Sequence, residues 1–415
     1  MKKIQLHYQI LIAMVVGAIV GFIFQNYITD YHNSYLYNII ISIGTIFIRL
    51  LKMIIVPLIF TSIISGISGI SDRSKLGRLG TKTLLYYLTT SFIAIVIGLS
   101  ITNIIQPGVD ASIVKDSSFD ADTLKRPGSP AEILIRMIPL NPVNAAASGD
   151  MLGIIFFAIF LGIGMTKLNK ANYEVLYTFF DSLFQLIMKI TEIIIKFAPL
   201  GVLGLITKVV ANSGLDVFLS IGKYMVTIAI GLSIHLFIVL PLLLFLMTRY
   251  NPVLHFKAMA SAMATAFSTS SSSATLPVTM KCVRGNVGVS DETSSFVLPM
   301  GATVNMDGTA LYECAGVIFI SQVLGVDLSL TQQFTVVITA LLASIGAAGI
   351  PSAGLVMIFI VTQSVGFSDE AVAGIIGTML AIDRPLDMFR TMVNITSDSV
   401  GTAIIAKSEG ETLYS

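Results

Sequence analysis

Apolar segments long enough to cross a lipid bilayer occupy most of the amino-terminal part of this chain. A helix needs about 20 predominantly apolar residues to cross the hydrocarbon core. Runs of this kind cover residues 8–27, 36–70, 80–105, 131–166, 172–200 and 215–248. The second run is too long for one perpendicular crossing, which predicts a strongly tilted helix or one that extends beyond the membrane. We therefore expect an integral membrane protein built from helices.

Composition supports this prediction and excludes other classes of protein. Hydrophobic residues make up 54% of the 415 residues and charged residues 12%, with a mean hydropathy of +0.86, which is outside the soluble range. The 25 basic and 24 acidic residues nearly cancel, so no nucleic-acid partner is expected. Cys282 and Cys314 lack metal-ligand spacing and are interpreted as packing residues. The four histidines are dispersed, so neither an enzyme, nor a catalytic residue, nor a bound cofactor is predicted.

The positions of lysine and arginine predict the orientation in the membrane, because short cytoplasmic loops collect them. Lys2 and Lys3 precede the first apolar run, and no small-residue cleavage site closes it, so this run is interpreted as a spanning helix. If each run crosses once, the basic residues of 73–82, 167–170 and 249–257 lie on the side of the amino terminus. We predict a multi-pass protein of the cell inner (plasma) membrane, with both termini cytoplasmic.

Polar interruptions break the apolar pattern after residue 251. Residues 268–273 contain five serines and one threonine, and residues 344–351 are small and flexible, with a proline near each break. Non-helical backbone at membrane depth persists only where protein or a water-filled cavity satisfies its polar groups. Each interruption therefore predicts a re-entrant hairpin whose tip lies near the membrane midplane, the first opening to the cytoplasm and the second outward. The alternative is a pair of kinked spanning helices.

Ionisable residues inside the last apolar segment, residues 371–406, form the second unusual feature. Such residues cost several kcal/mol at membrane depth unless they are paired, hydrated or turned toward a cavity. Their spacings of three and four place them on one helix face. The residues of this polar stripe are Asp383, Asp387, Arg390, Thr391, Asn394 and Asp398.

The chemistry of the stripe matches a zwitterion that carries a further carboxylate. The planar fork of Arg390 suits two carboxylate oxygens, and Asp387, one turn away, suits an ammonium group. The substrate's α-carboxylate would meet backbone N–H groups at the serine-rich tip, as anions do at helix amino termini. The alternative is a structural ion pair in which Asp387 and Arg390 neutralise each other.

Hard oxygen ligands for cations occur at two places. Asp307 follows Asn305 in a segment where Gly308 allows the helix to break, and Asp398 lies beside Asn394 on the polar stripe. Carboxylates, amide side chains and free backbone carbonyls are the ligands that such cations prefer. Two sodium sites are predicted, with helix capping by Asn305 and Asp307 as the alternative.

Three motifs carry a resemblance to a known family. The chain resembles the glutamate and aspartate transporters of the dicarboxylate/amino acid:cation symporter family, which includes the excitatory amino acid transporters. The similarity covers nearly the whole chain and is densest over residues 261–407. The motifs are Ser271-Ser272-Ser273-Ala274-Thr275-Leu276-Pro277, Asn305-Met306-Asp307-Gly308-Thr309 and Asp387-Met388-Phe389-Arg390-Thr391-Met392-Val393-Asn394.

The resemblance implies an all-α membrane protein with eight transmembrane helices and two re-entrant helical hairpins. It also implies an elevator-type homotrimer, in which a transport domain slides against a scaffold. The implied division is scaffold helices 1–2 (1–78), transport-domain helix 3 (79–106), an extracellular loop (107–130), scaffold helices 4–5 (131–212), transport-domain helix 6 (213–250), hairpin 1 (251–290), helix 7 (291–326), hairpin 2 (327–369), and helix 8 with a cytoplasmic tail (370–415).

The resemblance also implies roles for individual residues. Arg390 and Thr309 are expected to bind the substrate's side-chain carboxylate, and Asp387 and Thr391 its amino group. Asn394 and the backbones of Ser272 and Ile350 are expected to bind its α-carboxylate. The other implied substrate-binding residues are Ser271, Ser273 and Gly354. The three implied sodium sites are Gly301, Asn305, Asn394 and Asp398; Tyr87, Thr90, Ser91, Asn305 and Asp307; and Thr303, Met306, Ser344, Ile345 and Ala347. Ala347 stands where some relatives have a hydroxyl residue.

The same resemblance distinguishes substrates, because dicarboxylate carriers lack the aspartate at 387 and neutral amino acid carriers lack the arginine at 390. Both are present, which favours acidic amino acids over neutral amino acids or C4-dicarboxylates. Glu313 matches the glutamate of proton-coupled relatives, and its alternative is a permanent bridge to an arginine. Relatives usually keep an extra arginine where Ser270 or Met388 stands here. Arg384, beside Asp383, either substitutes for it or simply pairs with Asp383. Potassium counter-transport therefore stays open, as do proton-only coupling and a channel or receptor role.

Overall fold

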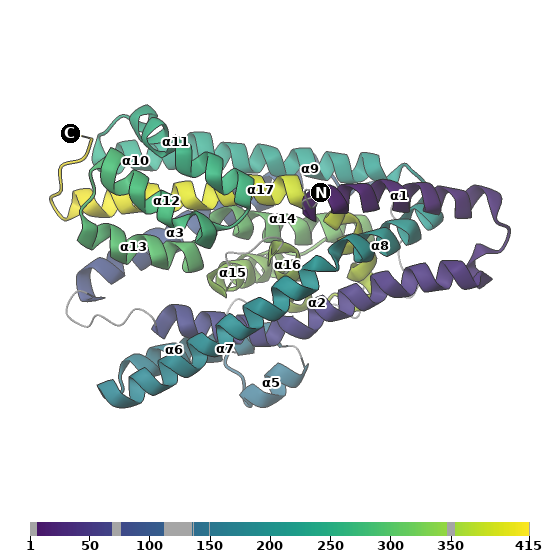
Figure 1. Ribbon diagram of the computed structural model, residues 1–415, viewed down its shortest axis with the longest axis horizontal. Coiled ribbons are helices and arrows are strands. Elements are labelled where there is room, and N and C mark those ends of the chain that lie inside the picture. Colours follow the sequence, from purple (N-terminus) through teal and green to yellow (C-terminus); the bar gives the residue numbers. More distant parts are fainter. Residues whose placement is uncertain are drawn as a thin grey trace, which may run out of the picture.

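The computed structural model describes residues 6–68, 76–111, 135, 137–148, 150–346 and 353–414. Within these ranges all regular secondary structure is helical, which confirms the predicted all-α class, and many of the helices run along the long axis of the molecule (Figure 1). Of the residue ranges expected to form loops and tips, most of 107–130 and the segment 347–352 lie outside the described residues.

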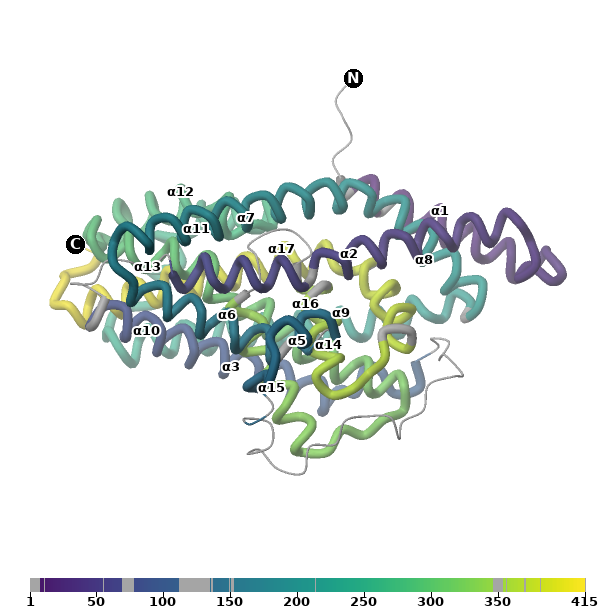
Figure 2. The backbone as a smooth tube through the Cα atoms, turned by 90° about the horizontal axis from the view of Figure 1, so that it is seen from below, coloured from purple at the N-terminus to yellow at the C-terminus, as the bar shows by residue number. Residues whose placement is uncertain are grey.

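The first half of the chain forms seven α-helices within the described residues, most of them long. These are α1 (Leu6–Tyr27), α2 (Tyr35–Ser68), α3 (Thr81–Ile105), α5 (Pro142–Ser148), α6 (Met151–Thr166), α7 (Lys170–Lys196) and α8 (Ala198–Ser213). The predicted single long helix is confirmed in α2, whose 34 residues correspond to roughly 50 Å at 1.5 Å per residue. Helices α2 and α7 lie side by side along one flank (Figure 2).

Two local features shape this half. Helices α7 and α8 meet at a bend of 52°. Pro199 stands there in the first turn of α8, and it has no N–H that could continue the hydrogen bonding of α7. Helices α1 and α8 pack so closely that a Cβ on Gly21 would lie 2.7 Å from the Thr207 carbonyl oxygen. Small residues at such contacts let the backbones of membrane helices approach each other.

The second half contains the interrupted segments. Its helical elements are α9 (Val217–Ile234), the π segment η4 (His235–Val239), α10 (Leu240–Thr248), α11 (Pro252–Thr269), α12 (Ser272–Cys282), the π segment η5 (Val283–Val287), α13 (Asp291–Val304), α14 (Asp307–Leu324), α15 (Leu330–Gly346), α16 (Ala353–Ser364) and α17 (Asp369–Ser408). Ser270 adopts a left-handed conformation (φ 52°) between α11 and α12, and the Ser271 hydroxyl caps α12 by accepting from the Ala274 N–H. Asn305 and Met306 separate α13 from α14.

Four described helical stretches are long and apolar enough to cross a membrane, and the bent pair α7–α8 would add a fifth. The four are Tyr8–Tyr27, Tyr35–Ser68, Arg78–Ile105 and Val217–Thr248. Helix α14 is different, because all of its residues except Gln322 are buried inside the protein. The helix between the two predicted hairpins therefore forms the centre of the carboxyl-terminal half.

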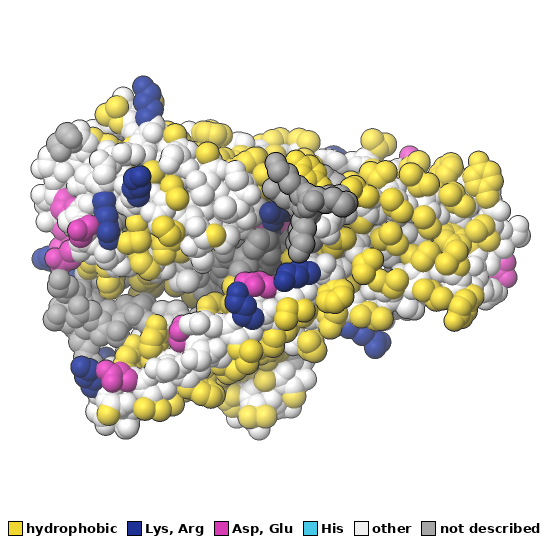
Figure 3. Space-filling view, in the orientation of Figure 1, with side chains coloured by type: hydrophobic (Ala, Val, Ile, Leu, Met, Phe, Trp, Pro, Cys, Tyr) yellow, Lys and Arg dark blue, Asp and Glu magenta, His cyan; other side chains and the backbone are white. Residues whose placement is uncertain are grey.

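The surface separates apolar from charged regions. On the face shown in Figure 3, hydrophobic side chains cover the end formed by α1, α8 and the start of α2, whereas most charged side chains lie toward the other end. At that charged end, residues 409–414 form a carboxyl-terminal clasp. Glu409 pairs with Arg78 in the π segment η2 (Leu76–Gly80) and with Lys82 in the first turn of α3. Glu411 accepts from the Ser290 N–H at 2.7 Å before α13. The clasp thus joins α17 to two other helices.

Candidate functional site

The polar stripe of α17 is buried along its length. Asp383, Asp387, Arg390, Asn394 and Asp398 are each at most 5% exposed, although α17 has 40 residues. Helices α11, α13 and α14 all contact α17, and most neighbouring residues of α17 are buried as well. The shared face is seen where Arg390 bonds to both Asp383 and Asp387.

Arg390 lies between two carboxylates. Its Nη2 donates to Asp383 Oδ1 at 3.0 Å and to Asp387 Oδ1 at 2.8 Å, and its guanidinium carbon lies 3.9 Å from the centroid of the Tyr312 ring. Nε and Nη1 have no hydrogen-bond partner among the described residues. A guanidinium offers five N–H donors in a fixed plane, so three donors of this buried cation stay available to a further acceptor.

Arg384 has a partner other than Asp383. Its Nη1 lies 3.7 Å from Asp387 Oδ2, while Asp383 pairs with Arg390. The idea that Arg384 simply pairs with Asp383 is therefore wrong. Asp387 instead lies between two guanidinium groups.

Asn394 connects α17 to the start of α14. Its Oδ1 accepts from the Gly308 N–H at 2.7 Å, and its Nδ2 lies 3.3 Å from the Thr309 hydroxyl and 3.3 Å from the Met306 sulfur. Glycine is required at 308, because a Cβ there would lie 2.8 Å from the Arg390 carbonyl oxygen. The structure thus brings the predicted residues Thr309 and Asn394 together beside Arg390.

The remaining predicted substrate residues differ in burial and in their contacts. The Thr391 hydroxyl donates to the Asp387 carbonyl within α17 at 2.8 Å. Ser272 is buried, whereas Ser273 is exposed. At the start of α16, a Cβ on Gly354 would lie 2.6 Å from Arg390 Nη1, so the backbone approaches the guanidinium there. Ile350 lies outside the described residues.

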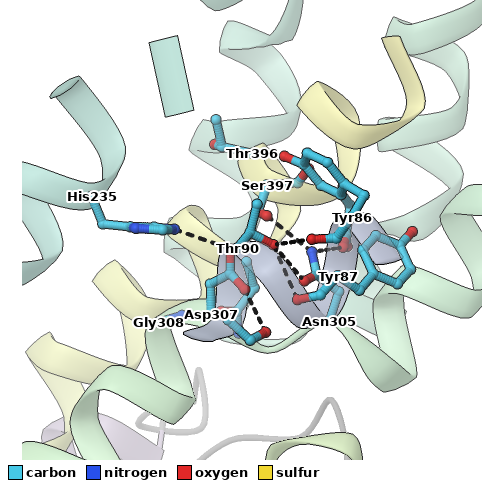
Figure 4. A network of polar contacts seen from close by, with 12 residues as sticks. Tyr86, Tyr87, Thr90, His235, Asn305, Asp307, Gly308, Thr396 and Ser397 are labelled. Atoms are coloured by element: carbon cyan, nitrogen blue, oxygen red, sulfur yellow. Dashed lines mark hydrogen bonds and ion pairs between the residues drawn. The ribbon is translucent and has the colours of Figure 1, made fainter. Parts of the chain in front are cut away.

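A second polar cluster surrounds Asp307 at the amino end of α14 (Figure 4). Asp307 Oδ1 accepts from the Ser91 hydroxyl at 2.6 Å, and Oδ2 lies 3.0 Å from His235 Nε2. Thr90 donates to Asn305 Oδ1 at 3.4 Å. The structure therefore brings α3 against the break before α14, as expected for a shared set of cation ligands.

The predicted set around Asp398 adjoins this cluster. Asn305 Nδ2 donates to Asp398 Oδ1 at 2.9 Å. A Cβ on Gly301 would lie 2.4 Å from the same oxygen and 2.6 Å from the Tyr87 hydroxyl. Tyr87 itself donates to the Val297 carbonyl at 2.8 Å. Asn305 thus contacts Thr90 of one predicted set through Oδ1 and Asp398 of the other through Nδ2.

The third predicted cation set is only partly assembled. The hydroxyls of Thr303 and Ser344 each donate to a carbonyl of their own helix, at 3.0 and 2.9 Å. Ile345 is half-buried and Met306 is buried, and α13 contacts α15. Ala347 lies outside the described residues.

Comparison with known proteins identifies the family. The family model for the sodium:dicarboxylate symporter family matches residues 6–408. The chain belongs to this family. It is similar to excitatory amino acid transporter 3 of Oryctolagus cuniculus, with 36% identity over 96% of this chain and 85% of that protein. It is also similar to excitatory amino acid transporter 3 of Homo sapiens (37%; 88% and 78%) and excitatory amino acid transporter 2 of Mus musculus (36%; 90% and 74%).

Membership of the sodium:dicarboxylate symporter family makes the chain a membrane transporter and not an enzyme. Sodium is the co-transported ion of this family. The two polar clusters therefore belong to a sodium-coupled symporter.

The symporter also contains polar residues that the sequence reasoning did not place. Ser397 accepts from Asn305 Nδ2 at 3.0 Å through its hydroxyl, and its carbonyl accepts from Tyr86 at 3.2 Å. His235 is one of the four dispersed histidines. Its place inside the predominantly apolar run 215–248 is the signal that the sequence offers for it.

Glu313 stands apart from these clusters. It is completely buried, and neither carboxyl oxygen has a hydrogen-bond partner among the described residues. It follows Thr309 by one turn of α14 and adjoins Tyr312, whose ring covers Arg390. A buried carboxyl without a donor is costly when ionised, which makes Glu313 a candidate to carry a proton.

Proposed function

We propose that this symporter takes up acidic amino acids, L-glutamate or L-aspartate, together with sodium ions. The observation that carries the proposal is the state of Arg390. It is buried and held by two carboxylates through one nitrogen, and its Nε and Nη1 have no partner among the residues that the structure describes. A fixed cation with unused donors inside apolar protein is suited to binding a carboxylate.

Each polar group of an acidic amino acid has a proposed partner. The side-chain carboxylate binds Arg390 and the Thr309 hydroxyl, and the ammonium group binds Asp387 with Thr391. Asn394 takes the α-carboxylate, together with backbone N–H groups at the two tips. The residues assigned to those tips are Ser271, Ser272 and Ser273 in the first hairpin and Ile350 and Gly354 in the second.

The charges present favour an acidic amino acid over the alternatives. Arg384 and Arg390 formally balance Asp383 and Asp387. A neutral amino acid would leave the open donors of Arg390 without an acceptor, and a C4-dicarboxylate would bring no ammonium to Asp387. Leaving a buried polar group unpaired costs about 1–3 kcal/mol, more for a charged group. Neutral amino acids and dicarboxylates are therefore the second candidates.

Sodium ions are proposed to bind where the carboxylates lie. One ion uses Gly301, Asn305, Asn394 and Asp398, and another uses Tyr87, Thr90, Ser91, Asn305 and Asp307. A third uses Thr303, Met306, Ser344, Ile345 and Ala347, mostly through carbonyls. An acidic amino acid carries a net charge of −1, so co-transported cations lower the cost of moving it through a low-dielectric region.

A proton on Glu313 is proposed as an additional coupling ion. Its carboxyl is buried and has no donor in the described part of the chain, and its protonated form needs no cation to be tolerated there. Potassium counter-transport is not part of the proposal, because the two positions where relatives usually keep an extra arginine are Ser270, directly before Ser271, and Met388, directly after Asp387.

For the architecture we propose eight transmembrane helices with two re-entrant hairpins, α11–α12 and α15–α16, in a homotrimer that works as an elevator. The transport domain comprises residues 79–106 and 213–415, and the scaffold comprises residues 1–78 and 131–212. The separate packing of α1 on α8 and of α14 on α3 and α17 supports this division. The protein lies in the plasma membrane with both termini cytoplasmic, which agrees with the charged end formed around the clasp.

Uptake into proteoliposomes tests the proposal. Labelled aspartate, glutamate, alanine and succinate are offered under a sodium gradient, a proton gradient, both or neither. Aspartate or glutamate uptake that requires the sodium gradient supports it, and a further increase with the proton gradient supports the role of Glu313. Uptake driven by protons alone would refute sodium binding at Asp307 and Asp398. Preference for alanine or succinate would refute the substrate assignment.

A further inference from the structure

His235 lies at the Asp307 cluster, although none of the predicted ligand sets includes it. Its side chain is completely buried, and Nε2 lies 3.0 Å from Asp307 Oδ2. In Figure 4 the imidazole extends from its own helix toward Asp307, from the side opposite Tyr87. Nδ1 has no partner among the described residues. The one hydrogen bond described for this side chain therefore goes to Asp307.

The local backbone explains how an apolar helix presents a histidine at this point. The Leu240 N–H donates to the His235 carbonyl, five residues back, so the helix widens into the π segment η4. Pro241 follows at once; it has no N–H and its ring disfavours regular α-helix over the preceding turn. Isolated π turns inside α-helices are frequent at functional sites, and this one begins at the residue that contacts Asp307.

The two donors to Asp307 act on different oxygens. Ser91 on α3 donates to Oδ1 at 2.6 Å, and His235 on η4 contacts Oδ2 at 3.0 Å. When Asp307 is ionised, as a sodium ligand has to be, it only accepts hydrogen bonds, and Nε2 then carries the hydrogen in this contact. Because the donors come from two different helices, they fix both the position of the carboxylate and the rotation of its plane.

We propose that His235 is a positioning residue for the sodium site at Asp307. It does not bind the ion, since Nε2 donates its hydrogen to the carboxylate. It holds Asp307 so that the remaining lone pairs face the ligands from Tyr87, Thr90 and Asn305. This inference rests on the sodium coupling proposed above and adds the residue that sets the affinity of this one site.

The test compares two substitutions of His235 in the full-length protein. His235→Leu removes the donor and puts an apolar side chain of intermediate size in its place. His235→Gln keeps a donor, because the glutamine amide nitrogen is separated from Cβ by the same number of bonds as Nε2 of histidine. The matched control is His255→Leu: His255 is also completely buried, but it bonds to Tyr414 and Ser399 and not to a proposed sodium ligand.

Two readouts are measured against sodium concentration for each protein. One is the initial rate of aspartate and glutamate uptake in proteoliposomes, and the other is the sodium-dependent rise in thermal stability of the purified protein without substrate. Hydrogen-bonded partners of metal ligands typically change affinity by about 10–100-fold. The quantity compared is the sodium constant, the sodium concentration at which each readout is half-maximal. We expect His235→Leu to raise it at least about tenfold in both readouts. His235→Gln should recover much of this loss, and His255→Leu should leave the sodium constant unchanged.

Three results would overturn the inference. An unchanged sodium constant in His235→Leu removes the positioning role, and an equal shift in His255→Leu means that any buried histidine acts through general packing. If His235→Leu does not fold, His235→Met against His235→Gln decides in the same way. A wild-type protein whose uptake and stability ignore sodium refutes the coupling itself and, with it, this site. That failure is distinguishable, because it appears before any substitution is made.

Discussion

Asp387→Asn separates the binding of an amino group from the binding of a carboxylate. The substitution removes one negative charge but keeps the shape of the side chain and an oxygen that accepts from Arg390 Nη2, now 2.8 Å from Asp387 Oδ1. Arg390 also keeps Asp383 at 3.0 Å. The protein should therefore still fold, while the site loses the carboxylate proposed for the substrate's ammonium group.

The size of the effect follows from the interaction that is lost. Hydrogen bonds to charged groups contribute about 1.5–3 kcal/mol, and each 1.4 kcal/mol corresponds to a factor of about ten in affinity. Asp387→Asn should weaken aspartate and glutamate by about 10–150-fold. Succinate, which has two carboxylates and no ammonium group, should lose much less, so its potency relative to aspartate should rise.

The assay is inhibition of labelled aspartate uptake by unlabelled aspartate and by succinate, in wild-type protein and in the variant. Asp383→Asn is the matched control, because it removes the same charge from the same Arg390 nitrogen but from a residue with no proposed substrate contact. A parallel loss of aspartate and succinate binding in Asp387→Asn would refute the reasoning. So would an equal change of preference in Asp383→Asn, since the effect would then come from the charge on Arg390 alone.

Three other perturbations test separate parts of the structure. Glu313→Gln should abolish any dependence of uptake on a proton gradient while sodium dependence persists, which transport under imposed gradients measures. The hydrogen bond from Lys82 holds the pKa of Glu409 below its ordinary value, so the clasp stabilises the fold above the ordinary glutamate pKa and loses this contribution as pH falls through the lowered value. Glu409→Gln should accordingly lower thermal stability near neutral pH by about 1 kcal/mol or less, whereas Glu174→Gln, from an exposed pair, should not. Gly21→Ala should cost about 1–3 kcal/mol, because its Cβ would meet an α8 carbonyl oxygen at 2.7 Å, and this is measured by thermal unfolding.

The breaks in the carboxyl-terminal half could be predicted because the residues there do not suit continuous membrane helices. A run of serines offers side chains that cap a new helix, and Ser271 does so for α12. Asn305 with Gly308 likewise marks the break before α14. The spacing of the polar residues on α17 was equally informative, since a regular helix converts spacing directly into a shared face.

Which acidic side chain pairs with which arginine could not be predicted from the sequence. Asp383 and Asp387 lie at almost equal distances from Arg390 Nη2, and sequence spacing cannot distinguish them, since positions three, four and seven residues away all share a helix face. Arg384 contacts Asp387 although Asp383 is its chain neighbour. Adjacent residues on a helix point in directions about 100° apart, which is why the neighbour is the less suitable partner.

His235 shows the limit most clearly. Prediction from apolar periodicity assumes 3.6 residues per turn throughout residues 215–248, and on that basis a lone histidine is only one polar residue in a lipid-compatible helix. The π segment inserts one residue into the turn that starts at His235, so the faces assigned before and after it differ by about one residue, or about 100°. Only the contact between His235 Nε2 and Asp307 Oδ2 in the folded protein reveals which way the imidazole faces. His235 is proposed to act through Asp307 and not on the ion itself. The decisive comparison is therefore between His235→Leu, which removes the N–H donor, and His235→Gln, which keeps one.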